Sequence, residues 1–254
     1  MKAFMNYPGA KWGMAQSIID RFPPHRSYLE PFFGSGAVLF NKTPSAIETV
    51  NDIDGEIINF FRVLKADSER LANAIEMTPY ARDVYDAAYI ERGDDCFDRA
   101  VSFLVRSRMG HGFKVHTKTG FKIDIHARER SYAVSCWNAT PTLLLEAAQR
   151  LKQVQIENRP AIDLIKRFNF ENVLIYADPP YLPSTRCCRQ YQWEMSEQDH
   201  IDLLTALLDH KGPVAISGYV SELYDEMLRT WTKTTVCRYN QNHDRRVECI
   251  WQNF

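Results

Sequence analysis

The sequence predicts an α/β fold built around a parallel sheet, and three observations carry this prediction. The apolar run at 173–177 has the length and composition of a strand that is buried on both faces. A short strand at 27–29 enters a glycine-containing turn, and a second strand follows at 46–50. Apolar residues recur at helical spacing between strands, as at 57–64. Strands that alternate with helices favour a parallel sheet covered by helices.

Length and composition describe one ordinary globular α/β domain with a large insertion. The chain has 254 residues, 45% hydrophobic and 25% charged, and a net charge of −1. Any affinity for nucleic acid must therefore come from local clusters of cations. No apolar run has the length of a membrane span and the N-terminus lacks a secretion pattern, so we expect a cytoplasmic protein without membrane contact. The six cysteines form no metal or disulfide pattern, which predicts reduced thiols and no metal.

The segment Asp178-Pro179-Pro180-Tyr181 directly follows the buried run and is the candidate catalytic element. Two prolines without N–H groups end the strand and fix an extended turn at the carboxyl edge of the sheet, where α/β folds bind ligands. The Asp178 carboxylate and the Pro179 carbonyl are suited to accept both hydrogens of a planar amino group such as N6 of adenine. Tyr181 offers an aromatic face on which the base can stack. A proline-rich turn with a capping aspartate is the alternative.

The N-terminal third contains three candidate cofactor-binding motifs. Tyr7-Pro-Gly-Ala-Lys11 is a tight loop before a helix, with a cation added by Lys11. Glu30, Phe32, Phe33, Gly34 and Gly36 form a strand-end turn, and Asp52 and Ile53 follow the next strand, where an acidic side chain suits ribose hydroxyls. Because Glu30 would repel a pyrophosphate and the third glycine of a dinucleotide fingerprint is absent, a cationic nucleoside, S-adenosylmethionine, fits better. An ordinary structural turn is the alternative.

Cations and glycines concentrate between residues 106 and 130. Lys118-Thr119-Gly120 predicts the tip of a basic hairpin, with aromatic residues interleaved. Such a hairpin suits phosphate contact and base-edge reading in DNA, with a solvated hairpin as the alternative. A polar loop after residue 183 adds a possible clamp. The candidate DNA-binding residues are Arg106, Arg108, Lys114, Lys118, Lys122, Arg186 and Arg189.

The remaining chain predicts further alternating elements. Pro160 lies in a strand-end loop that is a candidate to flank a bound adenine ring. Ser196 is expected to cap the helix that follows it. Helices are expected at 37–40, 141–151, 162–168, 200–209 and 221–228, and strands at 153–157, 213–217, 232–239 and 246–254, the last two as a closing antiparallel hairpin.

Taken in order, the motifs at 7–11, 30–36, 51–54 and 178–181, with the basic insertion between them, resemble the Dam-type (D12 class) DNA adenine-N6 methyltransferases. The phage and bacterial-orphan branch of this family is the most similar, because Thr185-Arg186 and Tyr191, which follow the turn at 178–181, are also familiar from that branch. The resemblance implies a Rossmann-like class I methyltransferase fold, a mixed seven-stranded sheet with helices on both faces. It also implies that Tyr7, Lys11, Asp52 and Asp178 contact S-adenosylmethionine, that residues 32–36 form its loop, and that residues 178–181 hold a flipped adenine.

From these motifs we expect an S-adenosylmethionine-dependent, adenine-specific methyltransferase acting on double-stranded DNA. Residues 1–65 and 150–254 would form the catalytic domain and residues 66–149 a helical, basic-hairpin target-recognition insertion. The recognition segment differs from that of GATC-specific members, which leaves the target sequence open. RNA adenine methylation and an inactive nucleic-acid-binding module are the alternatives, and a cognate restriction system and the oligomeric state are left open.

Overall fold

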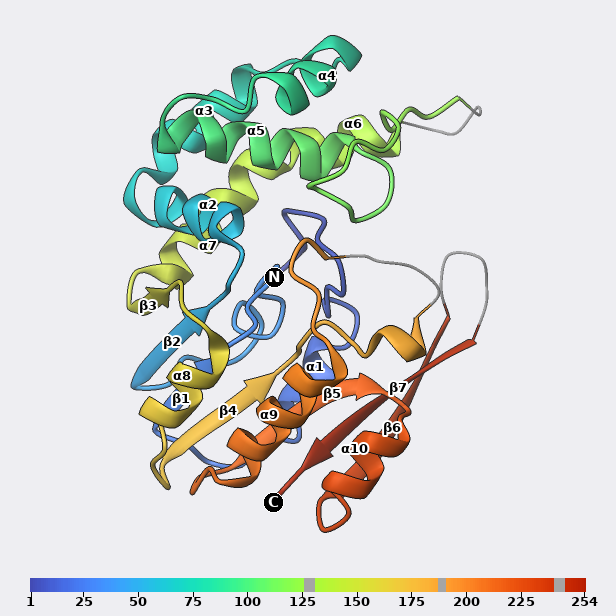
Figure 1. Cartoon of the computed structure of the whole chain (residues 1–254). Helices are drawn as coiled ribbons and strands as arrows, with labels where there is room; N and C mark the ends of the chain where they lie inside the picture. The colour runs from blue at the N-terminus through green and yellow to red at the C-terminus, as the bar shows by residue number, and fades with distance from the viewer. Residues whose placement is uncertain (126–130, 187–190, 240–244) are drawn as a thin grey trace. The chain divides into compact units, whose positions relative to one another are not determined.

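The computed structural model describes residues 1–125, 131–186, 191–239 and 245–254, and its chain divides into two compact units. Each unit is assembled from separate stretches of sequence, shown by the colour changes in Figure 1. The predicted insertion at 66–149 lies entirely within unit 1, which also takes in N-terminal residues. Unit 1 comprises Met1–Gly13, Gly34–Asn41 and Asp54–Ile156, and unit 2 comprises Met14–Phe33, Lys42–Ile53 and Glu157–Phe254.

Seven strands form one mixed sheet in the order β3-β2-β1-β4-β5-β7-β6. β1 pairs in parallel with β2 and β4, and β4 pairs in parallel with β5. β7 runs antiparallel to both β5 and β6, which confirms the closing hairpin and the seven-stranded mixed sheet. The strands are β1 (Ser27–Glu30), β2 (Ile47–Asn51), β3 (Val154–Glu157), β4 (Val173–Ala177), β5 (Val214–Tyr219), β6 (Thr232–Tyr239) and β7 (Arg245–Gln252).

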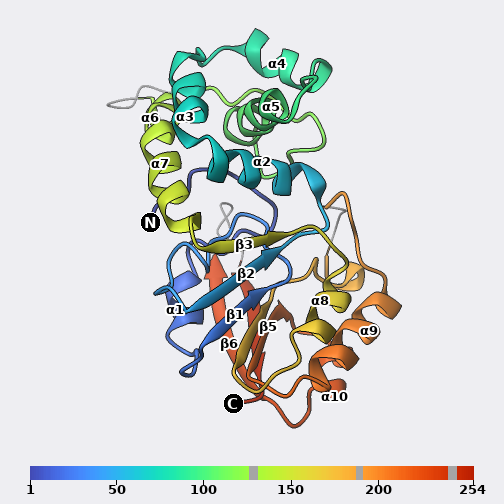
Figure 2. The same ribbon diagram turned by 90° about the vertical axis from the view of Figure 1, so that its left-hand side faces the viewer.

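The helices of unit 2 cover both faces of its sheet. Figure 2 shows α8, α9 and α10 on one side of the strands and α1 on the other. Leucines of α9 pack with Ile175 of β4, Ile216 of β5 and Trp251 of β7 in a continuous buried core. Ser196 caps α9 in a reciprocal capping box with Asp199, as the sequence predicts. These helices are α1 (Ala15–Ile19), α8 (Ala161–Arg167), α9 (Glu197–Leu208) and α10 (Glu222–Met227), with a 3-10 turn, η1 (Pro183–Thr185).

Unit 1 is built from helices around an aromatic core. Phe4 lies within 6.4 Å, centroid to centroid, of Phe40, Phe60 and Phe61, so the N-terminal segment is packed into the core of this unit. Burial of these rings stabilises the unit by about 1.5–3 kcal/mol for each side chain. The helices are α2 (Gly55–Ala66), α3 (Ser68–Met77), α4 (Arg82–Ile90), α5 (Cys96–Met109), α6 (Tyr132–Asn138) and α7 (Thr140–Leu151).

Two local predictions are wrong. Residues 37–40 form turns and not a helix, with one helical-type bond from Phe40 N–H to the Gly36 carbonyl. The expected hairpin after residue 106 is also absent from the described residues: α5 continues to Met109, and a single bridge joins Gly110 to Phe121. The basic residues of the segment gave no information on strand pairing, because charge patterns do not specify a ladder of hydrogen bonds.

Candidate active site

The strand order places the switch point of the sheet between β1 and β4. From β1 the chain proceeds to β2 and β3 on one side and then returns to form β4 on the other side. Loops that leave two such strands diverge, and open α/β sheets bind their ligands there. Glu30 is the last residue of β1, and Asp178 directly follows β4. The tertiary structure therefore brings two predicted site residues, far apart in the sequence, to one point of the sheet edge.

In the predicted turn at 178–181, called the elbow below, Tyr181 makes contacts through its hydroxyl, its backbone carbonyl and its ring. Its hydroxyl lies 3.3 Å from Asp178 Oδ1 and 3.2 Å from Glu248 Oε2, within reach of both carboxylates. Arg186 Nε donates to its carbonyl at 2.7 Å. The ring meets Tyr219 edge to face, with centroids 4.6 Å apart. Tyr181 is only 8% exposed, so its ring is held in one orientation by contacts within unit 2.

Carboxylates and tyrosine hydroxyls alternate around this elbow. Tyr28, which is fully buried, donates its hydroxyl hydrogen to the Glu30 carboxylate at 2.9 Å. The hydroxyl oxygen of Tyr176 lies 2.9 Å from the hydroxyl oxygen of Ser217. Burial raises the pKa of Tyr181 and Tyr176 well above the usual value, and the negative charge of Asp178 acts in the same direction. The hydroxyls therefore stay protonated donors at neutral pH. Such an acidic edge suits a neutral or cationic ligand and repels a phosphate.

Asn51 fastens three strand-end loops to one another. Its side-chain amide donates to the Pro31 carbonyl at 2.9 Å and to the Arg159 carbonyl at 3.0 Å. Its amide oxygen accepts the Arg159 N–H at 2.8 Å, and its backbone carbonyl accepts the Phe33 N–H at 2.8 Å. The predicted cofactor residues Phe32, Phe33, Asp52, Ile53 and Pro160 thus belong to loops joined by one fully buried amide.

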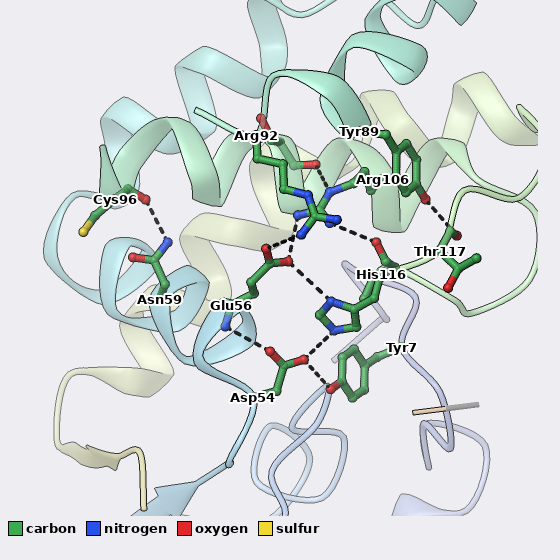
Figure 3. Close-up of polar contacts among 12 residues, drawn as sticks. Tyr7, Asp54, Glu56, Asn59, Tyr89, Arg92, Cys96, Arg106, His116 and Thr117 are labelled. Atoms are coloured by element: carbon green, nitrogen blue, oxygen red, sulfur yellow. Dashed lines mark hydrogen bonds and ion pairs between the residues drawn. The ribbon is translucent and has the colours of Figure 1, made fainter. Parts of the chain in front are cut away.

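In unit 1, Asp54 is the centre of a second polar network, drawn in Figure 3. Its Oδ2 accepts the Tyr7 hydroxyl at 3.0 Å and lies 2.6 Å from Nε2 of His116, while its Oδ1 accepts the Glu56 N–H and caps α2. Burial raises the pKa of Asp54, but the hydrogen bonds from His116, Glu56 and Tyr7 outweigh it, so the pKa is lowered. The predicted cofactor residue Tyr7 is thereby fixed by a charged hydrogen-bond acceptor.

The glycine turn predicted for the cofactor requires glycine. Gly34 has φ +47° and Gly36 has φ +68°, both in the left-handed region that side chains disfavour. A Cβ on Gly34 would lie 3.2 Å from Cδ1 of the Tyr7 ring. Lys11, only 4% exposed, donates to the Gly9 carbonyl at 2.7 Å. The N-terminal loop and the glycine turn therefore pack closely within unit 1.

Three arginines predicted to bind DNA make contacts within the protein, and the side chains of two of them, Arg106 and Arg186, are buried. The Arg106 side chain is 1% exposed and donates to Glu56 at 2.9 Å and to the Val115 carbonyl at 3.0 Å. Arg108 donates to the Cys136 carbonyl at 2.6 Å. Arg186, 4% exposed, forms an ion pair with Glu194. These guanidinium groups are engaged by two carboxylates and by backbone carbonyls of the protein, so nothing in their surroundings favours a DNA contact, and their assignment to DNA stays a prediction.

The predicted lysines of the same segment lie at the surface. Lys114 is exposed, and Lys118 is 47% exposed and pairs with Asp86 at 2.8 Å. Lys122 is partly exposed and lies 5.3 Å from the centre of the Tyr132 ring. Arg189 lies outside the described residues. The lysines lie at the surface, where ion pairs are weak, and the sequence pattern alone could not separate them from the arginines that make internal contacts.

Sequence reasoning missed three residues of these networks. Glu248 is a charged side chain between Val247 and the apolar run Cys249-Ile250-Trp251 of β7, and this position was a local signal for a buried carboxylate. Asn51 ends β2 beside the expected acidic residue and was noted only as part of its motif. For His116 no local signal exists, because its partner Asp54 lies 62 positions earlier.

Within the described ranges, no group of three or more His, Cys, Asp or Glu side chains is arranged to hold a metal ion. None of the helices in those same ranges is both long and apolar enough to cross a bilayer.

The strand order, with Glu30 at the end of β1 and the Asp-Pro-Pro-Tyr elbow after β4, defines a Rossmann-like methyltransferase. The chain belongs to the family of D12 class N6 adenine-specific DNA methyltransferases, whose sequence model matches residues 7–242.

Several bacterial DNA adenine methylases are similar to this chain. The Vibrio cholerae enzyme is 25% identical over 72% of this chain and 66% of its own length, slightly less than two thirds. The Escherichia coli K12 enzyme is 23% identical over 89% of this chain and 83% of its own. Among solved structures, precorrin 8W decarboxylase from Methanobacterium thermoautotrophicum aligns with 10% identity and a TM-score of 0.44, covering 98% of this chain and 94% of that one. That likeness is too distant to carry an argument.

Proposed function

We propose that the protein transfers the methyl group of S-adenosylmethionine to N6 of an adenine that is flipped out of double-stranded DNA. The observation that carries this proposal is the position of the Asp178–Tyr181 elbow beside Glu30 at the switch point of the sheet. An amino group is bound best where a carboxylate and a carbonyl converge on its two hydrogens, and an elbow fixed by prolines presents both.

The donor set of unit 2 fits a cationic nucleoside. Glu30 is 3% exposed and the Asp178 carboxylate lies near Tyr181, so negative charge dominates this edge. Bound S-adenosylmethionine supplies an electrophilic methyl group on a positively charged sulfur. The residues proposed to hold it are those expected from the sequence: Tyr7, Lys11, Glu30, Phe32, Phe33, Gly34, Gly36, Asp52, Ile53, Pro160 and Asp178.

In the proposed mechanism, Asp178 and the Pro179 carbonyl accept the two amino hydrogens of adenine and draw the nitrogen toward tetrahedral geometry. This frees the nitrogen lone pair for the methyl group. Tyr181 stacks on the base and limits its rotation. Positioning the nitrogen in line with the methyl group contributes about 7–11 kcal/mol to lowering the barrier. The nitrogen becomes acidic only after methylation, when its proton passes to Asp178 or to solvent.

Double-stranded DNA is the proposed substrate, and residues 66–149 are proposed to read it. The lysines Lys114, Lys118 and Lys122 support this assignment because they lie at the surface, where an exposed ion pair such as Lys118–Asp86 is weak and a phosphate can replace the carboxylate. Extruding the target base from the duplex costs a few kcal/mol, and contacts between the protein and the DNA backbone must offset this cost.

The test is methylation of unmodified plasmid DNA by the purified protein with S-adenosylmethionine. Single-molecule mapping should find N6-methyladenine at one recurring sequence. An RNA of the same sequence serves as the second substrate. Methylation of the RNA alone, or binding of DNA without any methyl transfer, would reject the proposal.

A further inference from the structure

Glu248 is a buried carboxylate that reaches the elbow from a strand distant in sequence. It lies on β7, directly opposite Tyr219 of β5 in the antiparallel register, and is 8% exposed. β7 is seen beside β5 in Figure 1. Oε2 of Glu248 lies 3.2 Å from the hydroxyl of Tyr181, which is 67 positions away in the sequence. A carboxylate is seldom buried in a strand without a charged or polar partner, so the contact with Tyr181 helps to explain its presence.

The Tyr181 hydroxyl has two carboxylates within reach and one hydrogen to give. Asp178 Oδ1 lies 3.3 Å from it, nearly as close as Glu248. A phenolic hydroxyl donates a single hydrogen bond at a time. When Tyr181 donates its hydrogen to Asp178, the Asp178 carboxylate becomes a weaker hydrogen-bond acceptor for another group. The partition of this hydrogen between the two acids therefore affects how strongly Asp178 accepts hydrogen bonds from an amino group.

The remainder of Tyr181 is held without help from Asp178. Arg186 donates to its carbonyl at 2.7 Å, and Tyr219 contacts its ring with centroids 4.6 Å apart. Glu248 completes this arrangement at the hydroxyl end. The ring can thus keep its orientation when Asp178 turns to a ligand.

We infer that Glu248 is a positioning residue, which takes the Tyr181 hydroxyl hydrogen and so keeps it from occupying part of the Asp178 carboxylate, the proposed acceptor for the amino group of adenine. This role rests on the proposed function of the elbow. It assigns to β7 a part in base binding although Glu248 does not itself contact the base.

The first test compares Glu248→Ala with Glu248→Gln. The amide oxygen of glutamine still accepts from Tyr181, so Glu248→Gln should retain most of kcat. Glu248→Ala removes one of the two carboxylates near the hydroxyl and shifts its hydrogen toward Asp178. The variant should lower kcat about 10- to 100-fold, the usual effect of one hydrogen bond to a charged group, with little change in KM for S-adenosylmethionine. Glu226→Ala removes an exposed carboxylate from α10 and is the matched control. Equal kcat for Glu248→Ala and this control would overturn the inference.

A double-mutant cycle identifies the partner. In a Tyr181→Phe protein no hydroxyl competes for Asp178, so adding Glu248→Ala should change kcat less than twofold. If Glu248→Ala costs the same factor with and without the Tyr181 hydroxyl, Glu248 acts elsewhere in the sheet and the inference fails.

A spectroscopic measurement separates this inference from the proposed function. In protein labelled with [ζ-13C]tyrosine, the resonance missing from Tyr181→Phe identifies Tyr181. That resonance should shift in Glu248→Ala and stay in place in Glu226→Ala, and an unshifted resonance would overturn the inference. Failure of the unmodified protein to methylate adenine would reject the proposed function, whereas this resonance reports the Tyr181–Glu248 contact without any methyl transfer.

Discussion

Nε2 of His116 lies 2.6 Å from Oδ2 of Asp54, and the same oxygen accepts the Tyr7 hydroxyl at 3.0 Å. His116 comes from the segment after α5, Asp54 caps α2, and Tyr7 belongs to the N-terminal loop. One carboxylate, only 3% exposed, therefore joins three separate stretches of unit 1. Because the partners are far apart in sequence, this joint contributes to tertiary stability and not to any single helix.

Replacing His116 should destabilise unit 1. His116→Ala leaves a buried carboxylate without its closest partner, and we expect a loss of about 1.5–3 kcal/mol in the free energy of unfolding. Urea unfolding followed by circular dichroism measures the loss. His111→Ala, an exposed histidine of the same segment, is the control and should change the value by less than about 0.5 kcal/mol. Equal stability of the two variants would contradict the assignment.

Removing the Asp178 carboxylate should abolish methyl transfer. Asp178→Ala takes away an acceptor for the adenine amino group, and we expect kcat to fall at least about 100-fold. Single-turnover methylation of plasmid DNA measures the rate. Asp202→Ala, an exposed carboxylate on α9, should retain the normal rate. A wild-type rate in Asp178→Ala would remove this residue from the mechanism.

Asp52 is expected to act on the cofactor and not on DNA. Asp52→Ala should raise the Kd for S-adenosylmethionine about tenfold or more, the effect of one charged hydrogen bond, and leave the Kd for DNA within twofold. Calorimetry measures the first constant and fluorescence anisotropy the second. Glu171→Ala, an exposed acidic residue of unit 2, provides the control. An unchanged cofactor constant would make Asp52 a structural residue.

The surface lysines Lys118 and Lys122 should strengthen DNA binding by contacting phosphates. Neutralising Lys118 and Lys122 together should reduce the slope of log K against log salt by about 0.9 for each lost contact. The methylated sequence should remain the same, because phosphate contacts do not read bases. Lys152→Ala/Lys211→Ala, at two exposed lysines outside the segment, is the matched control. A salt slope equal to that of the control would mean that Lys118 and Lys122 face solvent in the complex.

His200 should make the stability of the protein depend on pH. Burial lowers its pKa to about 4, with Asp199 and the Pro180 carbonyl acting in the opposite direction. The unfolded chain takes up this proton near pH 6.5, before the folded chain does, so stability is complete above pH 6.5 and declines as the pH falls toward 4. His200→Gln removes the effect. Between pH 7.5 and 5, wild type should lose about 2 kcal/mol more unfolding free energy than the variant in urea titrations. Parallel pH profiles would contradict the prediction.

Sequence patterns determined the elements whose signals are local. The run Val173–Ala177 is a strand buried along its whole length because five apolar residues leave it no polar face. Ser196 caps α9 because a hydroxyl and a carboxylate three positions apart satisfy its first N–H groups. Gly34 and Gly36 adopt positive φ, where other residues are strained. The order of these motifs was also sufficient to indicate the family to which the chain belongs.

Only the tertiary structure decided which charged side chains are buried together. Arg106 lies in a stretch as basic as that of Lys114, yet one is paired inside unit 1 and the other is exposed. Glu248 meets Tyr181, and His116 meets Asp54, across 67 and 62 positions. Such pairs depend on how helices and strands that are far apart in the chain pack together. The local spacing of residues in the sequence does not specify that packing.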